Sequence, residues 1–421
     1  MDATWRRKCK SDINGRRTGT FGYRRRLVSA RCIGLSRRWI KKMKLCLYLI
    51  FYFLAIGLCQ ANDSIETAKA QTYEAIDLHP LRDGMSHWRK RYGRDRNDPM
   101  YNPSQIVHIA ENMLAYQNAD GGWPNNIDWQ AQIDPDTVRA IKGERRMVST
   151  FDNHNTYSQI DYLAKVYIAT DLDRYRNAVE RGLDYIFREQ QPTGGWRGWD
   201  VDAITYNDGV MIGIMTLLKD IADRKPQFAW TSHELHAKAK AALHRAIAVT
   251  LKCQIVVKGK KTGWSQQHDH ITYKPVKART YELPSITAGQ TAKIVHFLMR
   301  IENPSSEIID AIETAVQWFQ EAKIEGIRLK RIEIDPTRFR NHTATTDLIV
   351  VKDPDAPPLW ARFHEIGTNR PFMANRDGNK VYSLSQVALE RRTGYAWYGY
   401  WPARILEKDY PMWKNKNRRQ Q

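Results

Sequence analysis

Apolar residues recur at three- and four-residue intervals along most of the chain between residues 104 and 322, and this spacing predicts a succession of helices. Ser104 caps the first of them, and Asn155 or Thr156 opens the second. The stretch 210–221 is apolar on every side, so we expect a helix that is buried all round. Residues 125–150 show no period and are expected to form a loop. The helices predicted after the first cover residues 156–167, 171–186, 210–221, 233–255, 287–301 and 308–322.

The pattern changes after residue 323. Residues 324–329 and 347–351 alternate in polarity or carry β-branched side chains, which is typical of strands. No charge run or low-complexity linker separates this region from the helices. Residues 325–385 are therefore expected to form a small antiparallel β lobe that packs on the helical body and does not fold alone.

One motif occurs three times, with a glutamine at the end of a predicted helix followed shortly by Gly-Trp. The copies are residues 117–123 (QNADGGW), 190–196 (QQPTGGW) and, more loosely, 254–264. Their tryptophans are 73 and 68 residues apart, which leaves room for two helices and a loop. We therefore predict a mainly α fold, a toroid or barrel of three helical hairpins with the β lobe attached. Such a ring would gather its inter-helix loops at one mouth.

The first 44 residues differ from the rest of the chain. They contain fifteen Lys and Arg against two Asp, which supplies +13 of the formal net charge of +20. Without an apolar period or acidic partners, residues 1–42 are expected to be a basic, disordered extension. A start codon assigned too far upstream (an over-called start) would explain such an extension. The basic residues 41–44, the apolar residues 45–58 and the following Cys59-Gln60-Ala61 have the order of a signal peptide, which we predict over residues 43–61.

A signal peptide implies a secreted or periplasmic protein with no membrane span after cleavage. Two alternatives remain at this point. The apolar stretch could be a signal-anchor helix that stays in the bilayer, although it is short for a span of roughly 20 residues. Cys59 could be a lipidation site, although the bulky Leu58 before it argues against this.

Composition excludes several other classes. Only Cys253 of the five cysteines follows the predicted cleavage site, so the mature chain has no internal disulfide and depends on its core for stability. Gly-rich phosphate loops, CxxC and HExxH motifs are missing, and the histidine cluster at 268–270 is more easily explained as a structural loop. Only the N-terminal extension suggests nucleic acid, so we predict no nucleic-acid partner. The 14 Trp and 20 Tyr suit sugar rings, although most are expected in the core.

Two aspartates stand directly before predicted helices. Asp152 precedes the helix at 156, and Asp208 precedes the helix at 210. Either could simply cap its helix, since Asp and Asn are preferred caps. Their equivalent positions on successive hairpins, however, direct both toward the same mouth. Two carboxylates that meet in a basic protein favour a divalent cation, and Ca²⁺ prefers hard oxygen ligands. Asp152 and Asp208 are therefore candidate metal ligands.

Basic residues also occur in predicted loops. Arg279 follows the third Trp, whereas Arg362 and Arg370 lie in the expected β lobe. Each alone could belong to a surface ion pair. Together with acids that could hold a metal, they describe a pocket for a polyanion.

Six ordered segments resemble the family 10 polysaccharide lyases, the helical pectate lyases, from about residue 100 to residue 402. The resemblance implies an (α/α)3 toroid, Ca²⁺ as cofactor, and β-elimination of (1→4)-α-D-galacturonan to unsaturated oligogalacturonates. It makes residues 62–421 the catalytic domain, which we expect to be a monomer acting on an acidic polysaccharide. The segments are residues 117–129 (QNADGGWPNNIDW), 151–167 (FDNHNTYSQIDYLAKVY), 204–211 (ITYNDGVM), 278–285 (ARTYELPS), 360–378 (WARFHEIGTNRPFMANRDG) and 390–402 (ERRTGYAWYGYWP).

The resemblance also implies roles for single residues. Asp152 and Asp208 match the aspartates of the calcium site, and Arg279 matches the arginine proposed as the base. Arg370 matches an arginine that holds the substrate carboxylate, and Arg362 is a second candidate for that role. Because a guanidinium is almost always charged, Arg279 could instead be an electrostatic clamp while water or hydroxide takes the proton. The sequence leaves both possibilities open.

One segment departs from the family. Between Trp196 and Ile204 the family usually has a longer stretch, whereas this chain has only residues 197–203 (RGWDVDA). The shortening and its two acids are expected to alter substrate binding beside the groove. They also leave a rival hypothesis, a non-catalytic surface protein that binds pectin or another uronate through a decayed site. A terpene-cyclase ring, which shares the Gln–Gly–Trp repeat, would need an Asp-rich acid motif that is missing here.

Overall fold

The computed structural model describes residues 64–95, 97–340 and 342–418. The predicted basic extension (1–42) and signal peptide (43–61) lie outside the described residues. Within the described part, no helix is both long and apolar enough to cross a membrane.

Seven helices lie where the apolar periodicity predicts them. Their inward faces are fully buried, as Ile160 and Leu163 show on the second of these helices. They are α3 (Ile106–Tyr116), α5 (Tyr157–Thr170), α6 (Asp173–Arg188), α7 (Val210–Ala222), α8 (His233–Lys252), α9 (Ala288–Leu298) and α10 (Ser306–Ala322). Helices α2 (Arg82–Tyr92), α11 (Leu389–Gly394) and α12 (Tyr410–Arg418) flank them.

The predicted loop 125–150 contains a helix that the periodicity missed, α4 (Pro135–Lys142). The Asp134 side chain accepts a hydrogen bond from the N–H of Thr137, and Pro135 occupies the first turn, so local start signals are sufficient here. Only Ile141 of this helix is buried. An amphipathic period is therefore not needed to place it.

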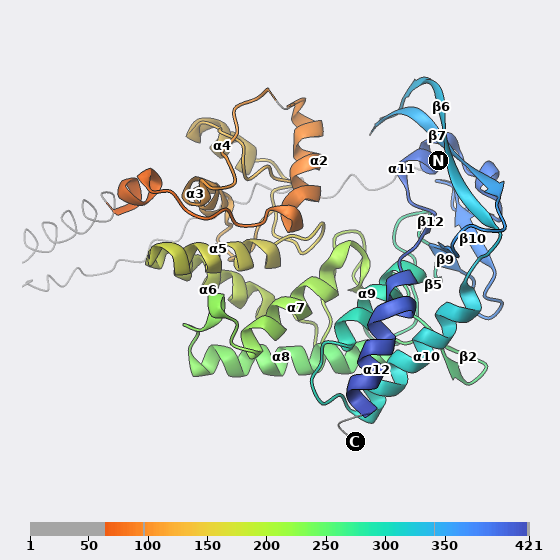
Figure 1. The fold of residues 1–421 in the computed structure, drawn as a ribbon. Coiled ribbons are helices and arrows are strands. Elements are labelled where there is room, and N and C mark those ends of the chain that lie inside the picture. Colours follow the sequence, from red (N-terminus) through yellow and green to blue (C-terminus); the bar gives the residue numbers. More distant parts are fainter. Residues whose placement is uncertain (1–63, 96, 341, 419–421) are drawn as a thin grey trace, which may run out of the picture. The chain divides into compact units, whose positions relative to one another are not determined.

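The helices form an open row of hairpins, and the predicted toroid is wrong. Helix α5 packs on α6, α7 on α8 and α9 on α10, while α3, α5, α7 and α9 each contact the next along the row (Figure 1). The described residues contain 46% helix and 14% strand and form no closed barrel. The physical reason is that α3 covers one end of the row, and strands and the C-terminal helix cover the other. The terminal hairpins therefore bury their faces without meeting each other.

The strands do not form the single β lobe that was predicted over residues 325–385. A long antiparallel ribbon joins β6 (Ile327–Arg338) to β7 (Thr343–Lys352), with a register shift between Glu333 and Thr337. The other strands form small antiparallel sheets that also draw on segments outside that range. They are β1 (Ile204–Thr205), β2 (Val256–Val257), β3 (Lys260–Lys261), β4 (Gln267–His268), β5 (Ile286–Thr287), β8 (Trp360–Ala361), β9 (Phe363–His364), β10 (Pro371–Ala374), β11 (Lys380–Val381) and β12 (Tyr398–Gly399).

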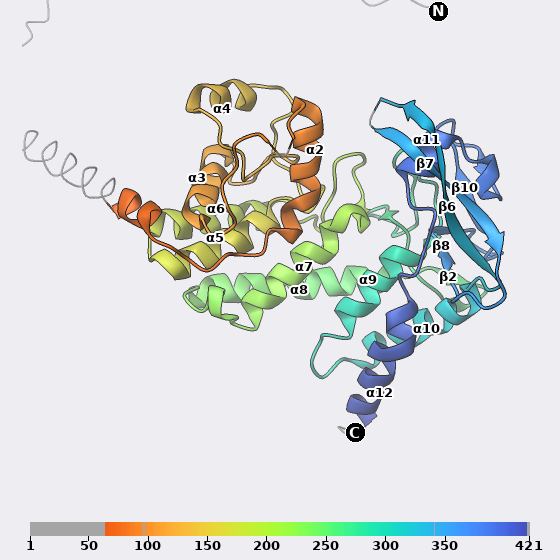
Figure 2. The same ribbon diagram turned by 45° about the horizontal axis from the view of Figure 1, so that its top comes forward.

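One strand pairing fixes the later segments on the helical row. Strand β9 pairs with β5, which leads directly into α9, and the N–H of Ala288 donates to the carbonyl of Arg362 at 3.3 Å. Figure 2 shows α2 and the β6–β7 ribbon on the same side of the row, as in the first view. The loops that lead into α5, α7 and α9 are therefore flanked by α2 and by the β6–β7 ribbon.

The three Gln–Trp motifs link neighbouring hairpins. In each copy the glutamine Nε2 donates to a carbonyl in its own loop and to a carbonyl of a later outer helix, which we call a Gln clamp. The pairs of acceptors are Gly121 and Ala178 for Gln117, Gly194 and Ala242 for Gln190, and Thr262 and Ala311 for Gln254, at 2.8 to 3.0 Å. The indole N–H of each buried tryptophan donates to the preceding helix, at Met113, Ile186 and Thr250.

Removal of a Gln clamp should destabilise the fold. We expect Gln254→Ala to lower the free energy of unfolding by about 2 kcal/mol, because one buried and one partly buried hydrogen bond to carbonyls are lost and a small cavity forms. Urea denaturation followed by circular dichroism measures the change. The control is Gln317→Ala on the exposed face of α10, where only a surface hydrogen bond to Glu321 is lost. Equal stability of the two variants would contradict the clamp.

Candidate active site

Asp152 and Asp208 lie in tight turns directly before α5 and α7. Asp208 belongs to a short 3₁₀ turn, η2 (Asn207–Gly209), and has φ of 49°, while Gly209 follows with φ of 76°. The N–H of His154 donates to the Asp208 carbonyl at 3.2 Å and ties the two turns together. Left-handed backbone of this kind is strained for non-glycine residues and is often found at functional sites.

Neither aspartate caps its helix. The N-caps of α5 and α7 are Thr156 and Gly209, and neither receives a side-chain cap hydrogen bond. From the described residues, the Asp152 carboxylate accepts only a long hydrogen bond of 3.4 Å from Asn125, and Asp208 accepts one of 2.9 Å from Asn207. The capping explanation is therefore wrong, and the two carboxylates are available for another role.

The electrostatics of the two carboxylates point to a missing positive charge. Burial raises the pKa of Asp152 to about 7, and the charges of Asp208 and Asp200 add to the rise, while Arg279 opposes it. Burial likewise raises the pKa of Asp208, again against Arg279. Within the described residues, neither carboxylate has a salt bridge. Buried carboxylates without a cationic partner are unfavourable unless a cation binds.

The donor set fits a divalent cation that takes only part of its ligands from the protein. Two carboxylates supply hard oxygens of the kind that Ca²⁺ prefers. The described residues hold no group of three or more His, Cys, Asp or Glu side chains placed for a metal. A cation held here would therefore complete its coordination with water and substrate oxygens.

Arg279 lies beside these carboxylates in the loop before β5. Its guanidinium forms an ion pair with the buried Glu282, and its Nε is 3.7 Å from the Asp200 carboxylate. Burial alone would lower the pKa of Arg279, but the hydrogen bond and charge of Glu282 raise it well above its usual range. Glu282 is itself fixed by the Tyr395 hydroxyl, which donates at 3.1 Å. Arg279 is thus rigidly held and fully protonated in this state.

Arg362 joins the same cluster, whereas Arg370 does not. The Arg362 Nε donates to the Ala396 carbonyl at 2.7 Å, its guanidinium stacks 4.1 Å from the Tyr395 ring, and its charge acts on Asp208. Arg370 is exposed in the turn between β9 and β10 and stacks 3.5 Å from the Tyr382 ring. No interaction among the described residues joins Arg370 to the two aspartates, so its role remains a prediction.

The structure adds three cations that the sequence interpretation missed. Arg376 and Arg391 lie 5.6 and 5.0 Å from the ring of Tyr281, the neighbour of Arg279, and both bind Glu390. Lys293 on α9 is close enough to Asp208 for their charges to interact. Both arginines stand inside segments that carry the family resemblance. For Lys293, the sequence offered one signal of a functional role, a single lysine in a largely apolar helix.

The shortened segment 197–203 borders this cluster. Asp200 faces Arg279, and the neighbouring Trp199 is 45% exposed, so the segment brings an acid and an aromatic ring to the edge of the site.

His268, in the histidine cluster at 268–270, is fully buried, and its ring nitrogen accepts a hydrogen bond from the N–H of Ser265 at 2.9 Å. Burial lowers the pKa of His268 to about 4, as expected for a structural residue.

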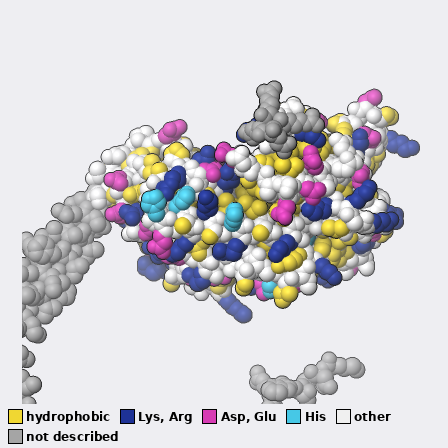
Figure 3. Space-filling view, turned by 90° about the horizontal axis from the view of Figure 1, so that it is seen from below, with side chains coloured by type: hydrophobic (Ala, Val, Ile, Leu, Met, Phe, Trp, Pro, Cys, Tyr) yellow, Lys and Arg dark blue, Asp and Glu magenta, His cyan; other side chains and the backbone are white. Residues whose placement is uncertain are grey.

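The face of the molecule seen from below carries no single patch of one charge. On the face shown in Figure 3, Lys and Arg side chains are scattered among acidic ones and do not gather in one patch. The distinctive feature is the local arrangement, in which unpaired buried carboxylates stand beside several arginines.

Comparisons with known proteins identify a family and similar solved structures. A family model described as pectic acid lyase matches residues 117–406. Two solved structures of a family 10 polysaccharide lyase from Cellvibrio cellulosa superpose with a TM-score of 0.59. One is an aspartate-to-alanine mutant in complex with trigalacturonic acid, 26% identical, covering 79% of this chain and 98% of that one. The other is 27% identical, covering 79% and 96%. A comparison with curated proteins found no match.

Proposed function

The chain belongs to the pectic acid lyase family and is a pectate lyase of polysaccharide lyase family 10, and we propose that it cleaves polygalacturonate by calcium-assisted β-elimination. The observation that carries the proposal is the pair of buried carboxylates, Asp152 and Asp208, which form no salt bridge among the described residues although arginines lie nearby. A relative with the same architecture binds trigalacturonic acid, which is a uronate with one carboxylate per sugar.

Asp152 and Asp208 would hold Ca²⁺ through their carboxylate oxygens. The bound cation would act as a Lewis acid on the substrate carboxylate and favour loss of the neighbouring C5 proton. The two aspartates come from successive hairpins, so the packing of α5 on α7 sets the opening between them. Asn125 and Asn207 donate to the carboxylates and orient them.

Arg279 would act on the reacting sugar itself. Its Nε is buried and makes no hydrogen bond within the described residues, but the side chain as a whole is 37% exposed, so a substrate oxygen could reach part of the guanidinium. Two roles remain for it: a base that accepts the C5 proton, or a clamp that stabilises negative charge while hydroxide takes the proton. The base role requires that bound Ca²⁺ and neighbouring arginines overcome the effect of Glu282, which keeps the guanidinium protonated.

Two further arginines would bind the carboxylates of the polymer. Arg362 and Arg376 flank Arg279, and a planar guanidinium can bind a carboxylate through two hydrogen bonds. Arg391 is buried and already binds Glu390 in this way. Arg370 keeps the same predicted role, that of binding a substrate carboxylate, although no interaction among the described residues joins it to Asp152 and Asp208. We further propose that residues 43–61 direct secretion or export to the periplasm and that residues 62–421 act as a monomeric catalytic domain.

The first test measures the unsaturated product. Mature protein, polygalacturonate and Ca²⁺ at alkaline pH should give a rising ultraviolet absorbance of the unsaturated uronate, and excess chelator should abolish it. Restoring Ca²⁺ should recover the rate. A signal that persists in chelator would refute the calcium role. No signal with folded protein that still binds pectin would favour the non-catalytic uronate-binding protein.

A further inference from the structure

A groove runs along α7 and α9, near the proposed calcium site at Asp152 and Asp208, which we call the calcium cluster. It consists of two adjoining cavities of about 460 and 400 Å³, which share Ile212, Thr216 and Lys293. Gly209, next to Asp208, lines one cavity, and Trp401 lines the other. One end of the groove therefore lies beside the turn that carries Asp208.

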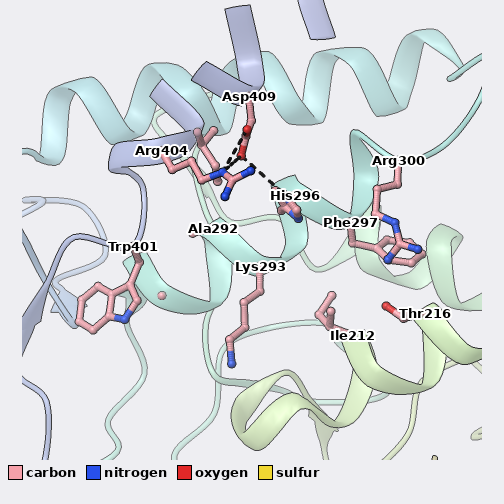
Figure 4. Close-up of a pocket in the computed structure, with 12 residues that line it drawn as sticks. Ile212, Thr216, Ala292, Lys293, His296, Phe297, Arg300, Trp401, Arg404 and Asp409 are labelled. Carbon is pink, nitrogen blue, oxygen red and sulfur yellow. Dashed lines mark hydrogen bonds and ion pairs between the residues drawn. The ribbon is translucent and has the colours of Figure 1, made fainter. Parts of the chain in front are cut away.

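Lys293 is the unpaired cation of this groove. Among the described residues it forms no hydrogen bond or ion pair, and its ammonium group extends into the open space between α9 and α7 (Figure 4). Neighbouring basic residues are already paired. Arg300 lies 3.4 Å from Asp220, and Asp409 binds both Arg404, at 3.1 Å, and His296, at 3.5 Å. An incoming carboxylate would find its free partner at Lys293.

Trp401 supplies a flat apolar surface beside Lys293. Gly399 makes room for the indole, because a Cβ at this position would come within 2.6 Å of it. The indole is half-buried, and the Arg362 guanidinium lies 5.9 Å from its ring. Aromatic faces of this kind pack against sugar rings. Trp401 therefore connects the arginine cluster to the groove.

We propose that Lys293 and Trp401 form an additional uronate-binding subsite beside the position at Asp152 and Asp208. A sugar ring of the substrate chain stacks on Trp401, and its carboxylate binds the Lys293 ammonium. The proposal rests on the proposed function, since it assigns a second sugar of the same polymer. Its consequence is that affinity rises with chain length once the substrate reaches this subsite.

The test compares oligogalacturonates of increasing length with polygalacturonate. Lys293→Gln should raise KM for the long substrates about tenfold, the effect of one hydrogen bond to a charged group, with kcat unchanged and no effect on the shortest cleaved oligomer. Lys293→Arg should restore the low KM. Trp401→Ala should raise KM for the same lengths, and Trp401→Phe should retain most of the affinity. The matched control is Lys240→Gln, at an exposed position on α8.

Three outcomes would overturn the subsite. These are an unchanged KM at every length, an equal loss at all lengths, and a loss of kcat alone, since the last two would place Lys293 in the calcium cluster. If the wild-type protein cleaves no uronate, the proposed function fails separately. Calorimetric titration of long and short oligogalacturonates then still tests the subsite, because Lys293→Gln must weaken only the binding of the long one.

Discussion

Arg279→Lys is expected to lower kcat on polygalacturonate by about a thousandfold while leaving calcium and oligogalacturonate binding nearly unchanged. The reason is geometric. The guanidinium contacts both Glu282 and Asp200, and the Arg279 side chain remains 37% exposed. A lysine keeps the positive charge, but its single nitrogen cannot reproduce the contacts that the planar guanidinium makes with both Glu282 and Asp200. Initial rates with Ca²⁺, together with calorimetric binding of trigalacturonate, measure the two effects separately.

The control for this substitution is Arg174→Lys, in a partly exposed ion pair with Glu111 on the outer layer of helices, where activity should not change. A loss of only about tenfold at position 279 would identify a simple electrostatic clamp, because charge alone would then suffice. If trigalacturonate affinity fell as far as kcat, Arg279 would be a substrate-binding residue and its assignment as base would lose its support.

Asp152→Asn is expected to remove calcium-dependent activity and, in chelator, to stabilise the protein. The folded-state pKa of Asp152, about 7, lies above the usual 3.8, so the folded state holds the proton more tightly than the unfolded state. Stability of the metal-free wild type therefore falls as pH rises from about 4 to about 7. At pH 8 the ionised carboxylate destabilises the fold by up to about 4 kcal/mol. Asparagine is uncharged, so it removes this destabilisation at pH 8 and changes the free energy of unfolding little at pH 4.5.

Urea denaturation in chelator at both pH values measures this difference, and the absorbance assay measures activity. Asp355→Asn is the control, since Asp355 is exposed and the change should stay within about 0.5 kcal/mol at either pH. A variant at position 152 that is no more stable than wild type at pH 8 would mean that another group already neutralises the carboxylate. Full activity with Ca²⁺ would remove Asp152 from the metal site.

The helices were predictable because each has a local pattern, whereas their closure into a ring was not. Trp123, Trp196 and Trp264 mark three hairpins correctly, since each indole binds its own preceding helix. A repeat, however, specifies only how one hairpin packs on the next. Whether the row closes depends on what covers its two ends, and those segments carry no repeat. Helix α4 was missed for a related reason, because it buries almost nothing.

The candidate site was predictable in part. Asp152, Asp208, Arg279 and Arg362 do converge, because helix starts and the β5–β9 pairing bring their loops together. Arg376 and Arg391 were missed, since choosing among several arginines in one segment requires the path of the backbone. The same limit applies to Arg370, whose turn points toward Trp318 on α10 through Asn369.

An open row of hairpins also has a consequence for cooperativity. Each Gln clamp links a hairpin only to its neighbour, so stability approaches a sum of nearest-neighbour contributions, as in a linear array. In such an array, partial unfolding starts at the ends, where each unit has a single neighbour. The loops that carry Asp152 and Asp208 precede α5 and α7, which have neighbours on both sides. The two carboxylates thus stand on the part of the array that opens least often.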